Sequence, residues 1–157
     1  MICYLDHIAI LKYDMCSNCM SLLDGPLLAG VGPNKLPIIM TLEDASLGFA
    51  YLDCLTLYLL SRLIRSDGVA AWTLHRVVDL KEILPVQNPK KGLRLIGFKE
   101  GGDIIFMTTD LGIYEINLKK LECKKLWKKT NIRAFIPYMS FYNLRGIFIY
   151  LLSRDLR

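Results

Sequence analysis

The chain has 157 residues, of which 53% are hydrophobic and 22% charged, a composition that fits one folded domain with a sizeable core and excludes a disordered chain. Its formal net charge is +5, but 15 acidic residues are mixed with the 20 basic ones, so the charge does not favour a nucleic-acid-binding protein. The five cysteines form no disulfide framework and no secretory signal pattern is evident, so we expect a cytoplasmic or nuclear location.

The first predicted element is a pair of strands joined by a turn in residues 7–23. The turn carries Cys16 and Cys19 at the spacing of half a zinc site. A structural zinc ion needs four ligands, and the sequence has no second pair of this kind. We therefore expect a turn that carries two thiols and holds no metal.

Residues 47–64 are apolar enough to suggest a membrane span, which needs about 20 uninterrupted apolar residues. Gly48, Asp53 and Arg62 interrupt the stretch. Its composition favours two strands of a sheet that meet at a tight turn near Asp53, so we expect no membrane partner.

Two longer segments, residues 37–80 and 93–128, repeat the same order of turns and strands, with Tyr58 aligned on Tyr114 and Trp72 on Trp127. Glycine-containing turns separate the strands, which predicts antiparallel hairpins and not a sheet wound through helices. A repeat of this kind, with three or four strands in each unit, is typical of propeller blades. We predict an all-β fold of antiparallel meander sheets that form about three blades of an incomplete β-propeller, since a closed ring needs about four to eight.

Three shorter segments complete the predicted elements. Residues 79–84 are predicted as one short helix, because Asp79 can cap its first turn and a proline follows, although a long connection fits the same residues. Residues 132–142 start a further unit. Residues 143–157 form a divergent tail, which either adds a strand to a sheet edge or is exposed without a role.

No residue pattern points to catalysis, and we predict no catalytic, cofactor-binding or metal-binding residue. The two histidines, His7 and His75, have no nucleophile or metal partner in a recognisable motif, and we expect His75 to be a structural strand residue. The lysine-rich residues 118–129 can combine phosphate contacts with stacking on Trp127. We prefer a solvated sheet edge protected by lysines, with Trp127 packed between blades.

Five motifs follow one another in a fixed order between residues 6 and 142: LEDASLGFA, LTLYLLSR, AWTLHRVVDLKEILPV, LGIYEINLKK and PYMSFY. In these motifs the chain resembles the F-box-associated β-propeller region of plant F-box proteins. The resemblance implies a protein-interaction module, not an enzyme, of the kind that captures a substrate for an SCF-type ubiquitin ligase. In that family an F-box docks on a Skp1-type adaptor. The chain lacks the Leu-Pro opening and leucine-rich helical pattern of an F-box, so we expect a truncated form that reaches the adaptor only through the missing F-box.

Two other interpretations stay open. A free-standing or decoy module would bind the same protein partners without recruiting a ligase, and a glycan-binding or nucleic-acid-binding β-domain would use a β-rich surface. The expected partner is a protein substrate, bound by loops whose residues are selected by the partner and not by the fold.

Overall fold

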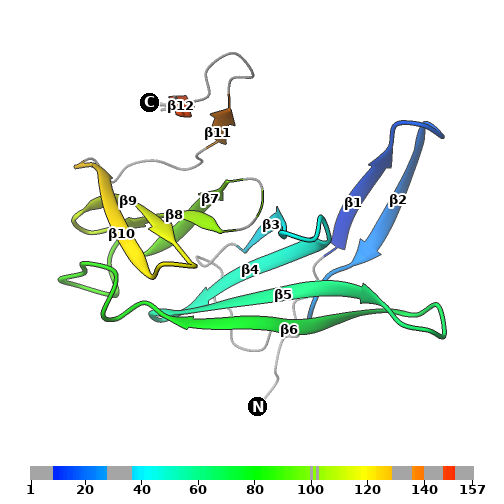
Figure 1. Ribbon diagram of the computed structural model, residues 1–157, viewed down its shortest axis with the longest axis horizontal. Helices are drawn as coiled ribbons and strands as arrows, with labels where there is room; N and C mark the ends of the chain where they lie inside the picture. Colours follow the sequence, from blue (N-terminus) through cyan, green and yellow to red (C-terminus); the bar gives the residue numbers. More distant parts are fainter. Residues whose placement is uncertain are drawn as a thin grey trace. The chain divides into compact units, whose positions relative to one another are not determined.

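The structure is a computed structural model that describes residues 9–27, 37–99, 101 and 103–128, together with the backbone of residues 136–139 and 147–150. The described residues form strands and turns and no helix, and all pairings between their strands are antiparallel (Figure 1). The prediction of an all-β fold of antiparallel meanders is confirmed. The chain divides into two compact units, Met1–Gly32 and Pro33–Arg157.

The first unit contains one hairpin, formed by β1 (Ala9–Asp14) and β2 (Cys19–Asp24). Its turn is stabilised by the Asp14 carboxylate, which accepts hydrogen bonds from the backbone N–H groups of Ser17 (3.1 Å) and Cys16 (2.9 Å). These two hydrogen bonds hold the pKa of Asp14 below its usual value, because they stabilise the charged form.

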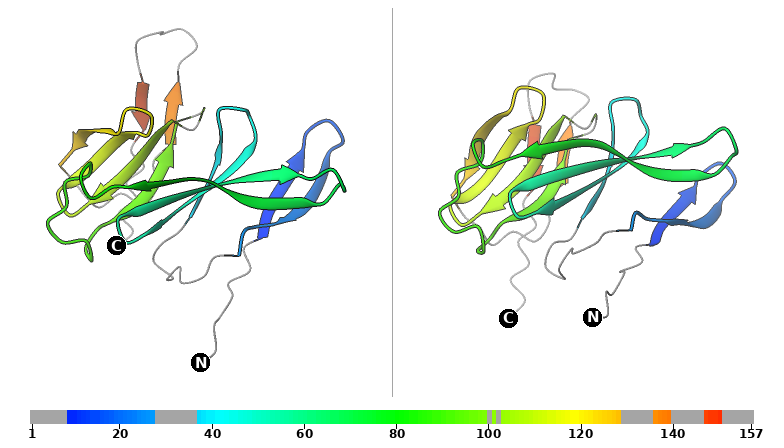
Figure 2. Two further views of the ribbon diagram at one scale, coloured as in Figure 1. Left: turned by 60° about the horizontal axis from the view of Figure 1, so that its bottom comes forward. Right: turned by 90° about the horizontal axis from the view of Figure 1, so that it is seen from below.

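The second unit begins with a four-stranded sheet of β3 (Ile38–Thr41), β4 (Leu47–Asp53), β5 (Thr56–Ile64) and β6 (Ala70–Asp79), in which sheet order follows chain order. β4 and β5 meet at a two-residue turn, so the two strands predicted for residues 47–64 are confirmed. Among the described residues no helix is long and apolar enough to cross a membrane. β5 and β6 form a long ribbon whose strong twist is visible in Figure 2, as expected of a long antiparallel pair.

A second four-stranded sheet follows, formed by β7 (Arg94–Phe98), β8 (Ile104–Thr109), β9 (Gly112–Asn117) and β10 (Glu122–Trp127), again in chain order. β11 (Ile136–Met139) pairs with β12 (Ile147–Tyr150) in a further two-stranded ribbon, and β11 lies next to β7. β12 belongs to the segment expected to be a divergent tail, and it adds a strand there.

The two four-stranded sheets share one hydrophobic core. Leu57 and Leu59 of β5 contact this core from one side, and Ile105 and Met107 of β8 from the other, and each of these side chains is at most 3% exposed. Burying one large aliphatic side chain contributes about 1.5–3 kcal/mol. The shared core therefore makes the two sheets one folded body.

The central hairpins of the two sheets repeat in register 56 residues apart (114 − 58 = 56). Tyr58 is the third residue of β5 and pairs with Tyr51, and Tyr114 is the third residue of β9 and pairs with Met107. The predicted alignment of the two tyrosines is therefore right. The alignment of the tryptophans is wrong, because the first lies near the start of β6 and the second is the last residue of β10.

Equivalent residues of the two hairpins lie on opposite sides with respect to the shared core. Leu57 and Leu59 face the core, so Tyr58 between them faces away, where it stacks on Tyr51 with ring centroids 4.8 Å apart. Tyr114 instead lies in the core and is 3% exposed. A two-fold axis between the sheets would turn the same face of both sheets toward the core. Here opposite faces of the two sheets meet, so the sheets form a directional repeat, in which each unit turns one face to the preceding unit and the opposite face to the next.

The helix predicted for residues 79–84 is wrong. Asp79 is the last residue of β6, where it pairs with Thr56, and the residues after it form turns. One helical hydrogen bond, from Leu84 N to Leu80 O (2.8 Å), closes a single turn. A single bond does not offset the cost of starting a helix. Burial of Leu80 (0% exposed) and Leu84 (3%) in the shared core determines the path of the segment instead.

Candidate functional site

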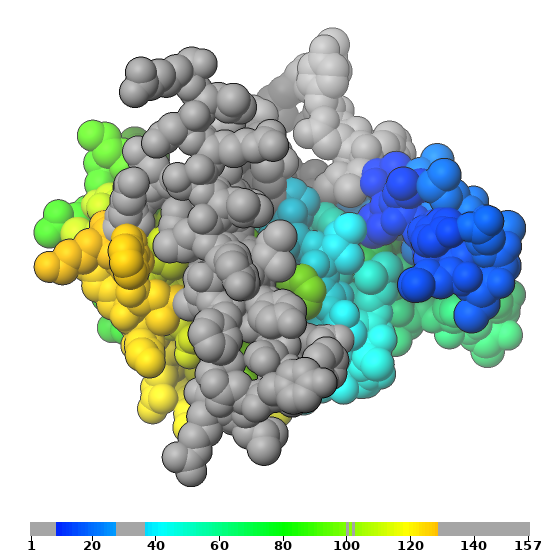
Figure 3. Space-filling model, turned by 90° about the horizontal axis from the view of Figure 1, so that it is seen from above, coloured from blue at the N-terminus to red at the C-terminus, as the bar shows by residue number. Residues whose placement is uncertain are grey.

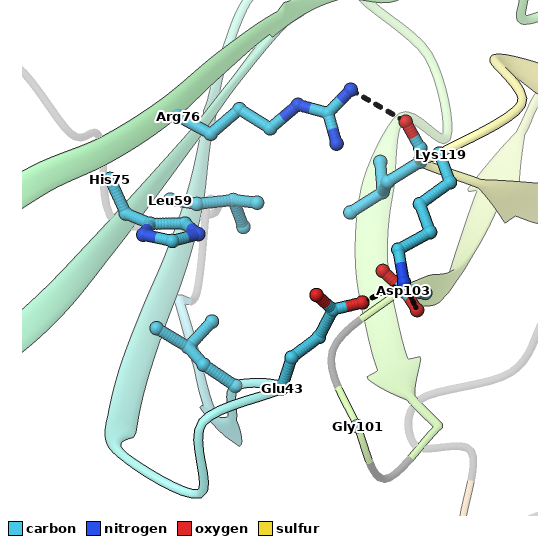
Figure 4. A pocket seen from close by; sticks show the side chains of 9 residues that line it. Glu43, Leu59, His75, Arg76, Gly101, Asp103 and Lys119 are labelled. Atoms are coloured by element: carbon cyan, nitrogen blue, oxygen red, sulfur yellow. Dashed lines mark hydrogen bonds and ion pairs between the residues drawn. The ribbon is translucent and has the colours of Figure 1, made fainter.

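A small pocket of about 90 Å³ lies between the two four-stranded sheets (Figure 4). It is formed by the β3–β4, β7–β8 and β9–β10 turns and by the middle of β5 and β6. This volume has room for about three water molecules. The lining residues are Leu42, Glu43, Leu59, His75, Arg76, Gly101, Asp103, Leu118 and Lys119.

A lysine connects two carboxylates at the mouth of the pocket. The Lys119 ammonium forms an ion pair with Glu43 of the first sheet and a second one, 3.0 Å long, with Asp103 of its own sheet. The three side chains are 59%, 55% and 35% exposed, so solvent screens the interaction and each pair stabilises the fold only modestly. The network nevertheless positions the β3–β4 turn against the second sheet.

These ion pairs shift the pKa values of two of the groups. The hydrogen bonds to Glu43 and then to Asp103 raise the pKa of Lys119, since they favour its charged form. Burial alone would raise the pKa of Asp103, but the hydrogen bond and the charge of Lys119 outweigh it and hold that pKa below its usual value. Both groups are therefore charged at neutral pH.

A β-bulge places two further side chains beside the pocket. Leu59 pairs with Arg76 and Leu60 with Leu74, so His75 is the extra residue on β6. Arg76 reaches across to the second sheet and donates a hydrogen bond from its guanidinium to the Leu118 carbonyl (2.7 Å), as Figure 4 shows. His75 is exposed and lines the wall of the pocket. The prediction of His75 as a strand residue is confirmed, and the structure adds its place at the bulge.

The pocket is suited to binding a polar group. Its polar lining consists of charged and imidazole side chains, and no serine, cysteine or threonine is among the lining residues. Lys119 already pairs with Glu43 and Asp103, and in the described part of the chain no three potential metal-ligating side chains gather in one place. The pocket is large enough for the tip of one polar side chain of a partner.

The other predicted residues lie elsewhere. Cys16 lies in the β1–β2 turn and Cys19 is the first residue of β2, and both are exposed free thiols. His7 falls outside the described residues. Trp127 was expected to pack between sheets, and that expectation is wrong, because its side chain is 54% exposed at the end of β10. Within the lysine-rich stretch, Lys119 turns to the pocket, while Lys125 lies over the Tyr114 ring with its Nζ 5.7 Å from the ring centroid.

Sequence reasoning missed the connection between Glu43, Asp103 and Lys119. They come from three different turns, and a sequence gives no sign that those turns meet. The signal that could have found two of them is the acidic turn at the start of each repeat, because equivalent turns of neighbouring repeats lie at the same end of a meander.

No known protein family, curated protein or solved structure matches the chain. Its function is therefore inferred from its own residues and their arrangement.

Proposed function

We propose that the chain is a protein-interaction module made of successive blades of an incomplete β-propeller, similar to the substrate-recognition propeller of an F-box subunit of an SCF-type ubiquitin ligase. The observation that carries the proposal is the directional repeat of the two four-stranded meanders. Successive blades of a propeller are related by rotation, which brings the opposite faces of neighbouring sheets together, as the placement of Tyr58 and Tyr114 requires.

The turns around the pocket form the proposed partner surface. Turns at one end of neighbouring blades lie close together, and binding residues occur there because the sheets beneath hold the turns rigidly. The pocket combines a carboxylate pair, a lysine and an exposed histidine in a small volume, which suits a polar side chain of a protein better than a large cofactor.

The ligase connection rests on the resemblance alone. Four of the five motifs that carry it fall on the β3–β4 hairpin, on β5 and β6, and on β9, and the fifth begins on β11. The resemblance therefore concerns the strands and not the adaptor-binding half of such proteins. In the proposal the module captures a protein substrate, and the transfer of ubiquitin is performed by partner enzymes.

The test is a pull-down with the full chain and two variants that introduce the same charge change. Glu43→Lys reverses a charge at the pocket, and Glu82→Lys makes the same change on an exposed turn outside it. We expect proteins retained from a cell extract by the wild type and by Glu82→Lys to be lost at least tenfold with Glu43→Lys. Equal retention by both variants would contradict the proposed surface.

Two additions to the same experiment separate the alternatives. Purified Skp1-type adaptor should not bind the chain by itself, and should join the complex only when an F-box is fused to the chain. Binding of the adaptor by the unfused chain would contradict the proposal that the chain binds only the substrate and that the F-box binds the adaptor. Retention on a polyanion resin that salt abolishes, with no protein partner captured, would favour the nucleic-acid interpretation instead.

A further inference from the structure

One wall of the pocket, formed by β6, presents hydrogen-bond donors. The Arg76 guanidinium extends across the pocket, and one of its nitrogens donates a hydrogen bond to the Leu118 carbonyl (2.7 Å), as Figure 4 shows. A guanidinium has several N–H donors, so this bond occupies only part of its capacity. The His75 ring comes from the adjacent position on β6 and points into the pocket, where a ring nitrogen can serve as a further donor. This wall can therefore donate hydrogen bonds to an acceptor group of a ligand.

The opposite wall presents hydrogen-bond acceptors. Glu43 comes from the β3–β4 turn and Asp103 from the β7–β8 turn, and the Lys119 ammonium lies between them. It pairs with Oε1 of Glu43 and with Oδ2 of Asp103, so each carboxylate has a second oxygen that these two contacts do not use. Figure 4 shows the second oxygen of Glu43 directed toward the middle of the pocket. This wall can therefore accept a hydrogen bond from an N–H group of a ligand.

The charges around the pocket disfavour a charged ligand group. Among the lining residues two side chains are carboxylates and two are cations, so their formal charges cancel. β10, which carries two further lysines, lies at the surface in Figure 3 and contributes none of the lining residues. A ligand carboxylate would approach Glu43 and Asp103, and a ligand ammonium would approach Arg76 and Lys119. Either group would meet like charges within a small volume.

A group without hydrogen-bonding atoms is also unfavourable, because it would displace water from the guanidinium and the carboxylates without replacing the hydrogen bonds of that water. A carboxamide is neutral and has a carbonyl acceptor beside an NH2 donor. The pocket, about 90 Å³ in volume, has room for about three water molecules and therefore for the carbon, oxygen and nitrogen of this group. Leu42 and Leu59, which also line the pocket, provide apolar contacts for the methylene groups that precede the carboxamide.

We propose that the pocket binds the carboxamide of a glutamine or asparagine side chain of a partner protein. Arg76 and His75 donate hydrogen bonds to its carbonyl oxygen, and Glu43 accepts a hydrogen bond from its NH2 group. The inference rests on the proposed function as a protein-binding module and names the chemistry of the side chain that enters the pocket. A site of paired donors and acceptors discriminates against a ligand that lacks one of them, because its own polar groups are then left without partners.

The test is a titration of the full chain, followed by nuclear magnetic resonance, with four ligands that differ only in their side chain. They are the N-acetyl, N-methylamide derivatives of glutamine, glutamate, lysine and methionine. The backbone amide signals of His75 and Gly101 report binding at the pocket. Glutamine and glutamate have the same shape, and methionine is a neutral side chain of similar length. We expect the glutamine derivative to bind at least about fivefold more tightly than each of the other three.

Three variants separate the proposed hydrogen bonds from effects on the fold. Arg76→Lys keeps the positive charge but loses the planar fork of donors, and should weaken binding of the glutamine derivative at least about fivefold. Arg65→Lys makes the same exchange on the exposed β5–β6 turn and should change this binding less than about twofold. Glu43→Lys should reverse the preference, so that the glutamate derivative binds more tightly than the glutamine derivative. Such a reversal cannot arise from a folding defect.

Three results would overturn the inference. The first is that the wild type binds the glutamate, lysine or methionine derivative as tightly as the glutamine derivative. The second is that the His75 and Gly101 signals do not shift with the glutamine derivative. The third is a preference for glutamine that survives in both Arg76→Lys and Glu43→Lys. If the glutamine derivative fails to bind while Glu43→Lys still loses proteins from the cell extract, the carboxamide ligand is refuted and the proposed function is not.

Discussion

Replacing Gly112 by alanine is expected to destabilise the second sheet strongly. Gly112 is the first residue of β9 and has a backbone φ of +144°, in a region that residues other than glycine rarely adopt. A Cβ atom here would overlap the Trp127 carbonyl oxygen and would lie 3.0 Å from Lys125 Cε and 3.2 Å from the Trp127 carbonyl carbon. The lysine end can move, but the β10 backbone can move only by giving up its pairing with Ile113.

The size of the effect follows from these two causes. The strained φ costs about 1–3 kcal/mol, and loss of one or two ladder hydrogen bonds adds about 1 kcal/mol each. We therefore expect Gly112→Ala to lower the free energy of unfolding by about 2–5 kcal/mol, a large share of the roughly 5–15 kcal/mol that holds a domain folded.

The matched control is Gly68→Ala in the β5–β6 turn. Gly68 also has a positive φ, +79°, but a Cβ there would meet nothing within 4 Å, so its cost is limited to about 1–2 kcal/mol of backbone strain. Urea unfolding followed by far-ultraviolet circular dichroism measures both variants, and equal m-values make the free energies comparable. If the two variants lose the same stability, the close approach of β9 and β10 at Gly112 is not real.

Three further predictions concern other turns. Ala45 has φ +61°, so Ala45→Gly should stabilise the fold by about 0.5–1 kcal/mol in the same urea assay, and a loss of stability would refute the strained turn. The Asp110 carboxylate accepts hydrogen bonds from the backbone N–H groups of Gln87 (3.2 Å) and Asn88 (2.8 Å), in the connection that follows β6. Asp110→Ala should therefore lower the free energy of unfolding by about 1–3 kcal/mol, and Asp110→Asn should lower it less. Hydrogen exchange of the Gln87 and Asn88 amides should be faster in Asp110→Ala than in the wild type. The lowered pKa of Asp103 contributes stability above about pH 3.9 that is lost on acidification, and the raised pKa of Lys119 contributes stability below about pH 10.4 that is lost on alkalinisation. Lys119→Met should therefore differ modestly from the wild type between about pH 5 and 10, with a difference that shrinks at both ends and in high salt, and a difference constant over all pH values would contradict the ion pairs.

Local sequence patterns predicted the strands and hairpins well, because the residues that decide them are neighbours in the chain. The turn after Asp53 and the register of Tyr58 and Tyr114 follow from alternation and turn chemistry alone. The residues after Asp79 defeated the same reasoning. Their helical signals are local, but burial of Leu80 in the core shared by the two four-stranded sheets outweighs them. No local pattern reveals that Leu80 contacts this core.

The pocket could not be predicted for a related reason. Lys119 was expected on a solvated edge as one of six lysines, and only the approach of two sheets distinguishes it from the others. Its partners lie 76 and 16 positions earlier in the chain (119 − 43 = 76, 119 − 103 = 16). Trp127 shows the converse, since a large apolar residue at a strand end was expected to be covered and is mostly exposed.

Consecutive pairing of the strands has a consequence for synthesis on the ribosome. Every pairing among the described strands joins immediate neighbours along the chain, so the β3–β6 meander can assemble as soon as its own four strands have emerged. Its leucine-lined face then stays exposed to solvent until β7–β10 are translated and pack against it. During that interval the nascent chain presents a sticky surface, and chaperones that shield such surfaces should be found on it at that stage and should leave once the following meander arrives.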